Sequence, residues 1–218
     1  MLTHSEENYL KAIFHLSLET DEDISTNAIA LKINSQPSSV TEMLKKMSDK
    51  SMISYQKYKG VSLTEVGQKT ALKIIRKHRL WEVFLFDKLN FSWDEVHEIA
   101  EQLEHIHSDK LTQELDRFLD YPQHDPHGDP IPNRAGFIQY SEKILLATLQ
   151  VGETARFVGV KDSSAVFLQY LDKRNIALGD LLTISFIEAF DQSMHVLIND
   201  SNHILSKQTI NNIYVLKV

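Results

Sequence analysis

The sequence predicts a mainly α-helical protein with a small β domain at its C-terminal end, and three observations predict it. Apolar residues recur three or four positions apart, the spacing of amphipathic helices, through most of residues 5–121. A stretch rich in Pro, Gly and Asp, YPQHDPHGDPIPNRAG, then breaks this periodicity. After Ser141 short alternating apolar runs take over, and turn residues separate them, as expected for the strands of a small β-barrel. The runs are ARFVGV, FLQYL, LLTISFIEA, HVLIND, HILSK and NIYVLKV. We therefore expect three domains, at residues 1–70, 71–140 and 141–218.

The first domain is expected to begin with an amphipathic helix at residues 5–19. A short helix follows and opens at Ser25 or Thr26. The next helix has Ser35 as its expected N-cap and Pro37 near its first helical position. Its expected buried stripe consists of Val40, Met43, Leu44 and Met47.

Residues 53–64, ISYQKYKGVSLT, place β-type residues around a Lys-Gly turn and predict a small hairpin. Helix, short helix, turn, helix and hairpin is the order of a winged helix-turn-helix, which puts a helix in the DNA major groove and the hairpin along the backbone. Hydroxyl residues can approach base edges, and lysines can contact phosphates. The expected DNA-binding residues are Gln36, Pro37, Ser38, Ser39, Thr41, Lys45, Lys46, Lys57 and Lys59. A helical hairpin with an ordinary basic surface is the competing interpretation.

Charge is unevenly distributed along the chain, which carries a net charge of −7. Residues 31–80 hold eleven Lys or Arg against three Asp or Glu, a net +8. Residues 81–218 hold eleven against twenty-one, a net −10. This division indicates one module that meets a polyanion and an acidic remainder that does not. A surface that is uneven by chance is the alternative.

Three further helical segments follow the hairpin. A long helix is expected at residues 64–89, and a second in FSWDEVHEIAEQLEH, where Trp93 and Asp94 resemble a capped start. The third begins at Ser108 and ends before Pro122. Because these segments carry more large apolar residues than one small module needs to bury, we expect a homodimer interface. A monomeric helical core is the competing explanation.

The stretch VHEIAEQLEHIHSDK, residues 96–110, gathers four carboxylates and three histidines. If the stretch is helical, four of them share one sector of about 100°: His97, Glu101, Glu104 and His105. Stacking like charges on a helix costs a few tenths of a kcal/mol per pair unless a cation or partner offsets it. The chain has no cysteine, so any metal must be held by oxygen and nitrogen, which suits Mn²⁺ or Fe²⁺. A solvated helix face is the alternative.

Ligand-type residues continue on both sides of this stretch. His78 and Glu82 are four positions apart on one expected helix face, and Asp125 and His127 are two apart in the Pro- and Gly-rich stretch. Six of the ten histidines fall between residues 78 and 127. We expect a ligand-rich belt between the basic module and the β domain.

Five segments occur in order along the chain: PSSVTEMLKKM, YQKYKGVSLTEVGQKTA, RKHRLWEVFL, VHEIAEQLEHIHSDKL and PHGDPIP. With them the sequence resembles the diphtheria-toxin-repressor family of metal-dependent transcriptional regulators, in its three-domain manganese-responsive branch. The resemblance covers essentially the whole chain. It implies a winged-helix DNA-binding domain, a helical dimerisation domain and an SH3-like C-terminal domain. It also implies a homodimeric repressor of metal-homeostasis genes that binds palindromic double-stranded DNA.

The resemblance further implies two metal sites, for Mn²⁺ or alternatively Fe²⁺. The primary site would use Asn8, His78, Glu101, Glu104 and His105. The second would use Glu82, Asp125, His127 and Asp162, with His97 as an ancillary ligand.

At three positions of these implied sites, the residue differs from the one that some or most members of the family carry. Asn8 stands where the manganese branch usually has an aspartate, and its amide oxygen is a neutral, weaker ligand than a carboxylate. Asp125 stands where some relatives have cysteine, and Glu101 where iron-responsive relatives have cysteine. We expect a bound ion to fix Asn8 against Glu104 and His105, and thereby to set the spacing of the two recognition helices of a dimer.

A carboxylate-bridged di-metal enzyme is the alternative from a different class. Glu104 and His107 form a Glu-x-x-His pair, but the only approximate mate is Asp94 with His97. A DNA-binding protein that does not need metal is a further alternative.

The composition excludes several other kinds of site and of protein. Without cysteine there are no disulfides, thiolate zinc sites or cysteine nucleophiles. No apolar run reaches 18 residues, and charge interrupts the first 16 residues. We therefore expect a cytoplasmic protein without a membrane partner.

Overall fold

The computed structural model describes residues 2–56 and 59–218, and the chain divides into two compact units. The first contains residues 1–81, 100–118 and 131–138, and the second contains residues 82–99, 119–130 and 139–218. Each unit has its own apolar core. Within the described parts, no helix is both long and apolar enough to cross a membrane.

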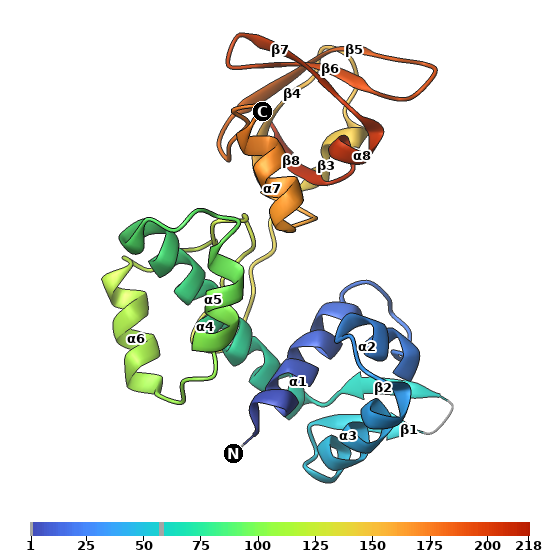
Figure 1. The fold of residues 1–218 in the computed structure, drawn as a ribbon, viewed down its shortest axis with the longest axis vertical. Coiled ribbons are helices and arrows are strands. Elements are labelled where there is room, and N and C mark those ends of the chain that lie inside the picture. The colour runs from blue at the N-terminus through green and yellow to red at the C-terminus, as the bar shows by residue number, and fades with distance from the viewer. Residues whose placement is uncertain (1, 57–58) are drawn as a thin grey trace. The chain divides into compact units, whose positions relative to one another are not determined.

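The first unit opens with three helices in the predicted order (Figure 1): α1 (His4–Ser17), α2 (Thr26–Lys32) and α3 (Pro37–Asp49). Thr3 and Glu6 form a capping box at the start of α1, and the hydroxyl of Ser25 accepts a hydrogen bond from Ala28 N–H at the start of α2. The predicted start of α2 is confirmed.

The start of α3 differs from the prediction. Its N-cap is Gln36, which makes no side-chain capping bond, and Pro37 is in the first turn. The prediction of Ser35 as the cap was wrong, because the backbone N–H of Ser35 donates to Ala30 O and closes the end of α2. Val40, Leu44 and Met47 are fully buried as predicted, whereas Met43 is half-buried.

The predicted hairpin is present as β1 (Ile53–Gln56) and β2 (Gly60–Leu63), which pair antiparallel with Ile53 opposite Leu63. α3 packs against β1, and α1 packs against β2. The three helices and the hairpin thus form a winged helix-turn-helix around one core.

Three helices follow: α4 (Glu65–Leu89), α5 (Val96–Leu103) and α6 (Asp109–Phe118). The hydroxyl of Ser108 accepts from Leu111 N–H and caps α6. α5 begins later than its predicted capped start, because the N–H and hydroxyl of Ser92 bond to Glu95 and hold the preceding residues in a turn. Trp93 is instead buried in the core of the second unit.

The β domain of the second unit is a six-stranded antiparallel sheet in the order β3-β8-β4-β5-β6-β7. Along its strands buried and exposed side chains alternate, most regularly in β6. The strands are β3 (Ile144–Leu145), β4 (Thr154–Val160), β5 (Leu181–Ile187), β6 (Met194–Ile198), β7 (Ser201–Leu205) and β8 (Ile213–Lys217). A 3₁₀ turn η1 (Leu146–Thr148) and helix α8 (Lys207–Ile210) connect them.

One segment predicted as a strand is helical. FLQYL, residues 167–171, lies in α7 (Ala165–Asp172), whose start is capped by Ser164. Leu168 and Leu171 are both fully buried, at helical spacing. A short apolar run is compatible with both the helical and the strand periodicity, and the N-cap at Ser164 favours the helix here.

Candidate metal centres and DNA-binding surface

The first candidate metal centre surrounds the carboxylate of Glu104 in the first unit. Glu104 follows the last turn of α5 and is fully buried. Its Oε2 lies 2.6 Å from Nδ1 of His78 on α4, and both of its oxygens lie 2.8 Å from Nζ of Lys11 on α1. Burial raises the pKa of Glu104, but the hydrogen bond to His78 and the charge of Lys11 outweigh burial and hold this pKa below its ordinary value. Glu104 is therefore available as an anionic ligand.

Two more of the predicted ligands border Glu104. Glu101, in the last turn of α5, forms an ion pair with Lys11. Nε2 of His105 lies 4.0 Å from Oε1 of Glu104, and Nδ1 of the same ring lies 2.6 Å from Oε2 of Glu7 on α1. The first unit thus brings imidazoles and carboxylates from α4, α5 and the turn after α5 together beside α1.

Asn8 supplies the feature of α1 that most directly indicates a cation. Its side-chain Oδ1 is buried and has no hydrogen-bond partner within residues 2–56 and 59–218. Leaving such an acceptor unpaired costs about 1–3 kcal/mol, a cost that a bound cation removes. Amide, carboxylate and imidazole donors without sulfur fit a divalent ion such as Mn²⁺ or Fe²⁺.

The second candidate metal centre lies in the second unit and consists of Glu82, Asp125 and His127. Each offers one ligand atom, all three atoms lie within 4.8 Å of one another, and all three residues are buried. Nε2 of His127 lies 2.8 Å from the carbonyl oxygen of Trp93, so this nitrogen carries a proton and donates it. Nδ1 faces Glu82 at 3.8 Å and is the nitrogen left for a metal.

The electrostatics of this centre favour a positive charge. Burial lowers the pKa of His127, but hydrogen bonding to Glu82 and the negative charges of Glu82 and Asp125 outweigh it and raise the pKa to about 9. The same carboxylates that retain a proton on the ring would favour a cation in its place.

A tight loop holds the ligands of the second centre. Oδ1 of Asp125 accepts the backbone N–H groups of His127 and Asp129, at 2.9 and 3.0 Å. Gly128 has a φ of +84°, and a Cβ at this position would lie 2.0 Å from the carbonyl oxygen of Val158. Only glycine lets the loop approach β4 this closely.

Two residues predicted for the second site lie outside the group of three. Nδ1 of His97, which is largely exposed, lies 3.2 Å from Oε1 of Glu82 and so borders the centre. Asp162 lies between β4 and α7, where its Oδ1 accepts the N–H of Ser164. Its carboxylate is not among the ligand atoms that come together with Glu82 in the described chain.

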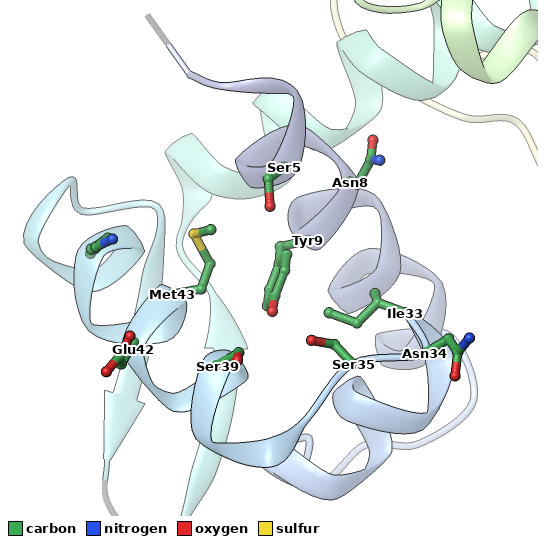
Figure 2. Close-up of a pocket in the computed structure, with 10 residues that line it drawn as sticks. Ser5, Asn8, Tyr9, Ile33, Asn34, Ser35, Ser39, Glu42 and Met43 are labelled. Carbon is green, nitrogen blue, oxygen red and sulfur yellow. The ribbon is translucent and has the colours of Figure 1, made fainter.

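The predicted DNA-binding residues lie on α3 and the hairpin. Most are exposed: Gln36, Pro37, Ser38, Ser39, Lys45, Lys46 and Lys59. Thr41 is half-buried, and its hydroxyl donates to Pro37 O at 2.9 Å, which turns this side chain back onto its own helix. Lys57 lies outside the described residues. Figure 2 shows a pocket between α1 and the start of α3, and both Asn8 of α1 and Ser39 of α3 are among the residues that line it.

Sequence reasoning missed two residues of α1 that contact the first centre, Glu7 and Lys11. They are four positions apart, a spacing usually typical of a solvated i,i+4 pair. Instead Glu7 pairs with His105, and Lys11 pairs with the two glutamates. Both residues therefore contact partners that are distant in the sequence, and no local sequence pattern predicts such contacts.

Three family models match consecutive parts of the chain. The N-terminal DNA-binding domain of iron-dependent repressors matches residues 1–61. Their metal-binding and dimerisation domain matches residues 64–133, and the FeoA domain matches residues 144–217.

Among curated relatives, a probable metal transport system membrane protein of Chlamydia trachomatis is 45% identical over 73 residues, which are 34% of this chain and 16% of that protein. The iron-dependent repressor IdeR of Mycobacterium tuberculosis is 30% identical over 131 residues, which are 60% of this chain and 56% of that protein. The chain therefore matches only part of the length of these two relatives.

A solved structure covers the full length. It is a manganese-dependent transcriptional repressor in complex with manganese, with a TM-score of 0.89 and 31% identity, and the match covers 97% of this chain and 99% of that one. The expected fold class, a winged helix-turn-helix with a helical dimerisation domain and an SH3-like domain, is confirmed. The relatives that share it are repressors, so the alternative of a di-metal enzyme is excluded. The chain belongs to the diphtheria-toxin-repressor family of metal-dependent transcriptional regulators.

Proposed function

We propose that this chain is a cytoplasmic repressor activated by Mn²⁺, or alternatively by Fe²⁺, whose homodimer binds palindromic operators of metal-homeostasis genes. One observation carries the proposal. The buried, ionised carboxylate of Glu104 contacts Lys11 of α1 and His78 of α4. α1 in turn packs in the same core as the recognition helix α3.

The metal preference follows from the donor set. His78, Glu104 and Asn8 offer nitrogen and oxygen without sulfur, which suits Mn²⁺ and Fe²⁺ more than soft ions. The relatives support both ions, since one solved repressor is a complex with manganese and IdeR is named as iron-dependent. Intrinsic affinity still rises from Mn²⁺ to later metals, so selectivity depends on geometry and availability in the cell.

The chain's own residues would couple the first centre to DNA. A bound divalent ion would supply the positive charge that Lys11 provides to Glu101 and Glu104 in this structure. Asn8 would offer the ion an oxygen from α1, and α1 holds α3 through their common core. In a homodimer this fixes the spacing of two recognition helices, which then fit two half-sites one or more helical turns apart. Coupling of this kind is typically about 1–3 kcal/mol.

The proposal is tested by selecting bound genomic fragments with purified protein in Mn²⁺, in Fe²⁺ without oxygen, and in chelator. We expect a palindrome to be enriched only with metal. Equal enrichment in chelator would mean that the ligand cluster is structural, held by Lys11 rather than by a metal.

A pair of variants assigns the response to the first centre. Glu104→Ala is expected to remove the gain in DNA affinity on adding Mn²⁺, about 5–150-fold in wild type. Glu114→Ala, which removes an exposed glutamate of α6 paired with Arg117, is the matched control and should retain the gain. If Glu104→Ala gains DNA affinity on adding Mn²⁺ as wild type does, the assignment of Glu104 to the primary metal site is wrong.

A further inference from the structure

Glu7 is a buried carboxylate of α1 that contacts the edge of the His105 ring opposite the edge near Glu104. It is 4% exposed, and its Oε2 lies 2.6 Å from Nδ1 of His105, 98 residues further along the chain. The other ring nitrogen, Nε2, is the one near Oε1 of Glu104, at 4.0 Å. The imidazole therefore lies between a carboxylate on one side and the candidate ligand cluster on the other.

This arrangement defines which nitrogen of His105 is free to bind a metal. A neutral imidazole carries one proton, and a carboxylate that accepts a hydrogen bond from Nδ1–H keeps the proton there. Nε2 is then a lone-pair donor directed toward Glu104. A carboxylate in this position also fixes the orientation of the ring, and losing such a partner typically costs 10–100-fold in metal affinity.

Neighbouring contacts hold Glu7 and His105 in place. The ring of His4 stacks on that of His105, with centroids 4.3 Å apart and planes 6° apart. The capping box of Thr3 and Glu6 fixes the first turn of α1, from which Glu7 projects. Nδ1 of His107 lies 3.8 Å from the second oxygen of Glu7, so a second imidazole borders this carboxylate.

We propose that Glu7 is a positioning residue of the first metal centre, which acts through His105 and gives α1 an anionic link to the bound ion. The inference rests on the proposed function. It assigns to Glu7 a role that the neutral amide of Asn8 does not fill, because an amide adds no negative charge behind His105. α1 is then tied to the metal by two means, an oxygen of Asn8 and a ligand held by Glu7.

The test compares Glu7→Ala, Glu7→Gln and Glu6→Gln in the full chain. Glu6→Gln is the matched control, because Glu6 is the adjacent carboxylate of α1, equally buried, and pairs with Lys50 instead of a histidine. The amide oxygen of glutamine can still accept the N–H of Thr3, so the capping box is retained. Mn²⁺ affinity is measured by competition with a chelating dye, and the tautomer of His105 by long-range ¹H–¹⁵N NMR before adding metal. Circular dichroism melting checks that each variant is folded.

We expect Glu7→Ala to weaken Mn²⁺ binding 10–100-fold and to lose the Nδ1–H tautomer at His105. Glu7→Gln retains an acceptor oxygen, so it should keep the tautomer and lose less affinity. Glu6→Gln should bind Mn²⁺ within about twofold of wild type. Wild-type Mn²⁺ affinity in Glu7→Ala, or an equal loss of Mn²⁺ affinity in Glu6→Gln, overturns the proposal. If Glu7→Ala does not fold, Glu7→Gln decides. A reduced Mn²⁺ affinity in Glu7→Gln then supports the proposal, and a wild-type affinity overturns it.

Failure of this inference is separate from failure of the proposed function. If wild-type protein binds Mn²⁺ but gains no DNA affinity, the proposed function fails while the role of Glu7 at the metal stands. If wild type responds to Mn²⁺ and the Glu7 variants bind the ion as wild type does, only the role of Glu7 fails.

Discussion

Lys50, the C-cap residue of α3, donates two hydrogen bonds to the carboxylate of Glu6 near the start of α1, at 2.7 and 2.8 Å. Glu6 is 4% exposed and also accepts the N–H of Thr3 in the capping box. Burial raises the pKa of Glu6, but the bonds from Lys50 and Thr3 outweigh it and hold the pKa below its ordinary value. The ion pair joins the helix that faces the first metal centre to the recognition helix.

Lys50→Met is therefore expected to weaken the coupling between metal and DNA without changing metal affinity. Because the Lys50 side chain is 42% exposed, the pair is worth on the order of 0.5–1 kcal/mol, and the Mn²⁺-induced gain in DNA affinity should fall about two- to fivefold. Fluorescence anisotropy with and without Mn²⁺ measures this gain. Lys69→Met, which removes an exposed pair with Glu65, is the control, and an equal loss there would count against a specific link.

The exposed lysines of α3 should contribute to DNA binding through phosphates. Lys45→Ala is expected to weaken binding to specific and unrelated sequences alike, and to reduce the slope of log affinity against log salt by about 1. Titrations at several salt concentrations measure the slope. A loss confined to one sequence with the slope unchanged would instead assign Lys45 to base recognition.

Local sequence patterns predicted most of the first unit. Helical periodicity located α1, α2 and α3, and the Lys-Gly turn located the hairpin, because each signal lies within a few consecutive residues. The strand prediction at 167–171 failed because a five-residue apolar run fits both periods. The cap at Ser164 was the available signal, and it was overlooked.

The candidate metal centres were less predictable in detail. The cluster of His and Glu residues could be recognised in the sequence, but which residues pair within it depends on contacts between distant segments. The bond between Glu7 and His105 spans 98 positions, and that between Lys11 and Glu104 spans 93. Nothing in the local sequence marks Glu7 or Lys11 as a partner of these residues, because only the folded chain brings them together.

Asp125→Asn is expected to remove the second metal site while retaining its loop. An asparagine keeps an oxygen to accept the N–H groups of His127 and Asp129, but it loses the negative charge that balances a cation. Metal content per chain, measured after dialysis against Mn²⁺, should fall from two ions to about one. An unchanged stoichiometry would remove Asp125 from the ligand set.

The glycine of the same loop provides a stability test. Gly128→Ala should destabilise the protein by about 2 kcal/mol or more, because it combines a positive φ with a Cβ 2.0 Å from the carbonyl oxygen of Val158. Gly136→Ala is the matched control, since its φ is +80° with nothing within 4 Å, and it should cost only about 1 kcal/mol. Urea unfolding gives both values, and equal costs would show that the contact with β4 adds nothing.

The raised pKa of His127 predicts a dependence of stability on pH in the presence of chelator. Negative charge from Glu82 and Asp125 holds the folded-state pKa at about 9, above its ordinary value of 6.5. A raised pKa stabilises the folded protein fully below about pH 6.5, and this contribution is lost as the pH rises through about 9. The free energy of urea unfolding should fall over this range by on the order of a few kcal/mol.

His127→Gln isolates this effect, since the variant should lack the part of the slope that the imidazole contributes. Mn²⁺ must displace the proton from His127, so the affinity of the second centre should rise over the same pH range in wild type and not in the variant. Identical slopes in the two proteins would mean that His127 is neutral near pH 7, and that Glu82 and Asp125 do not hold a charge on it.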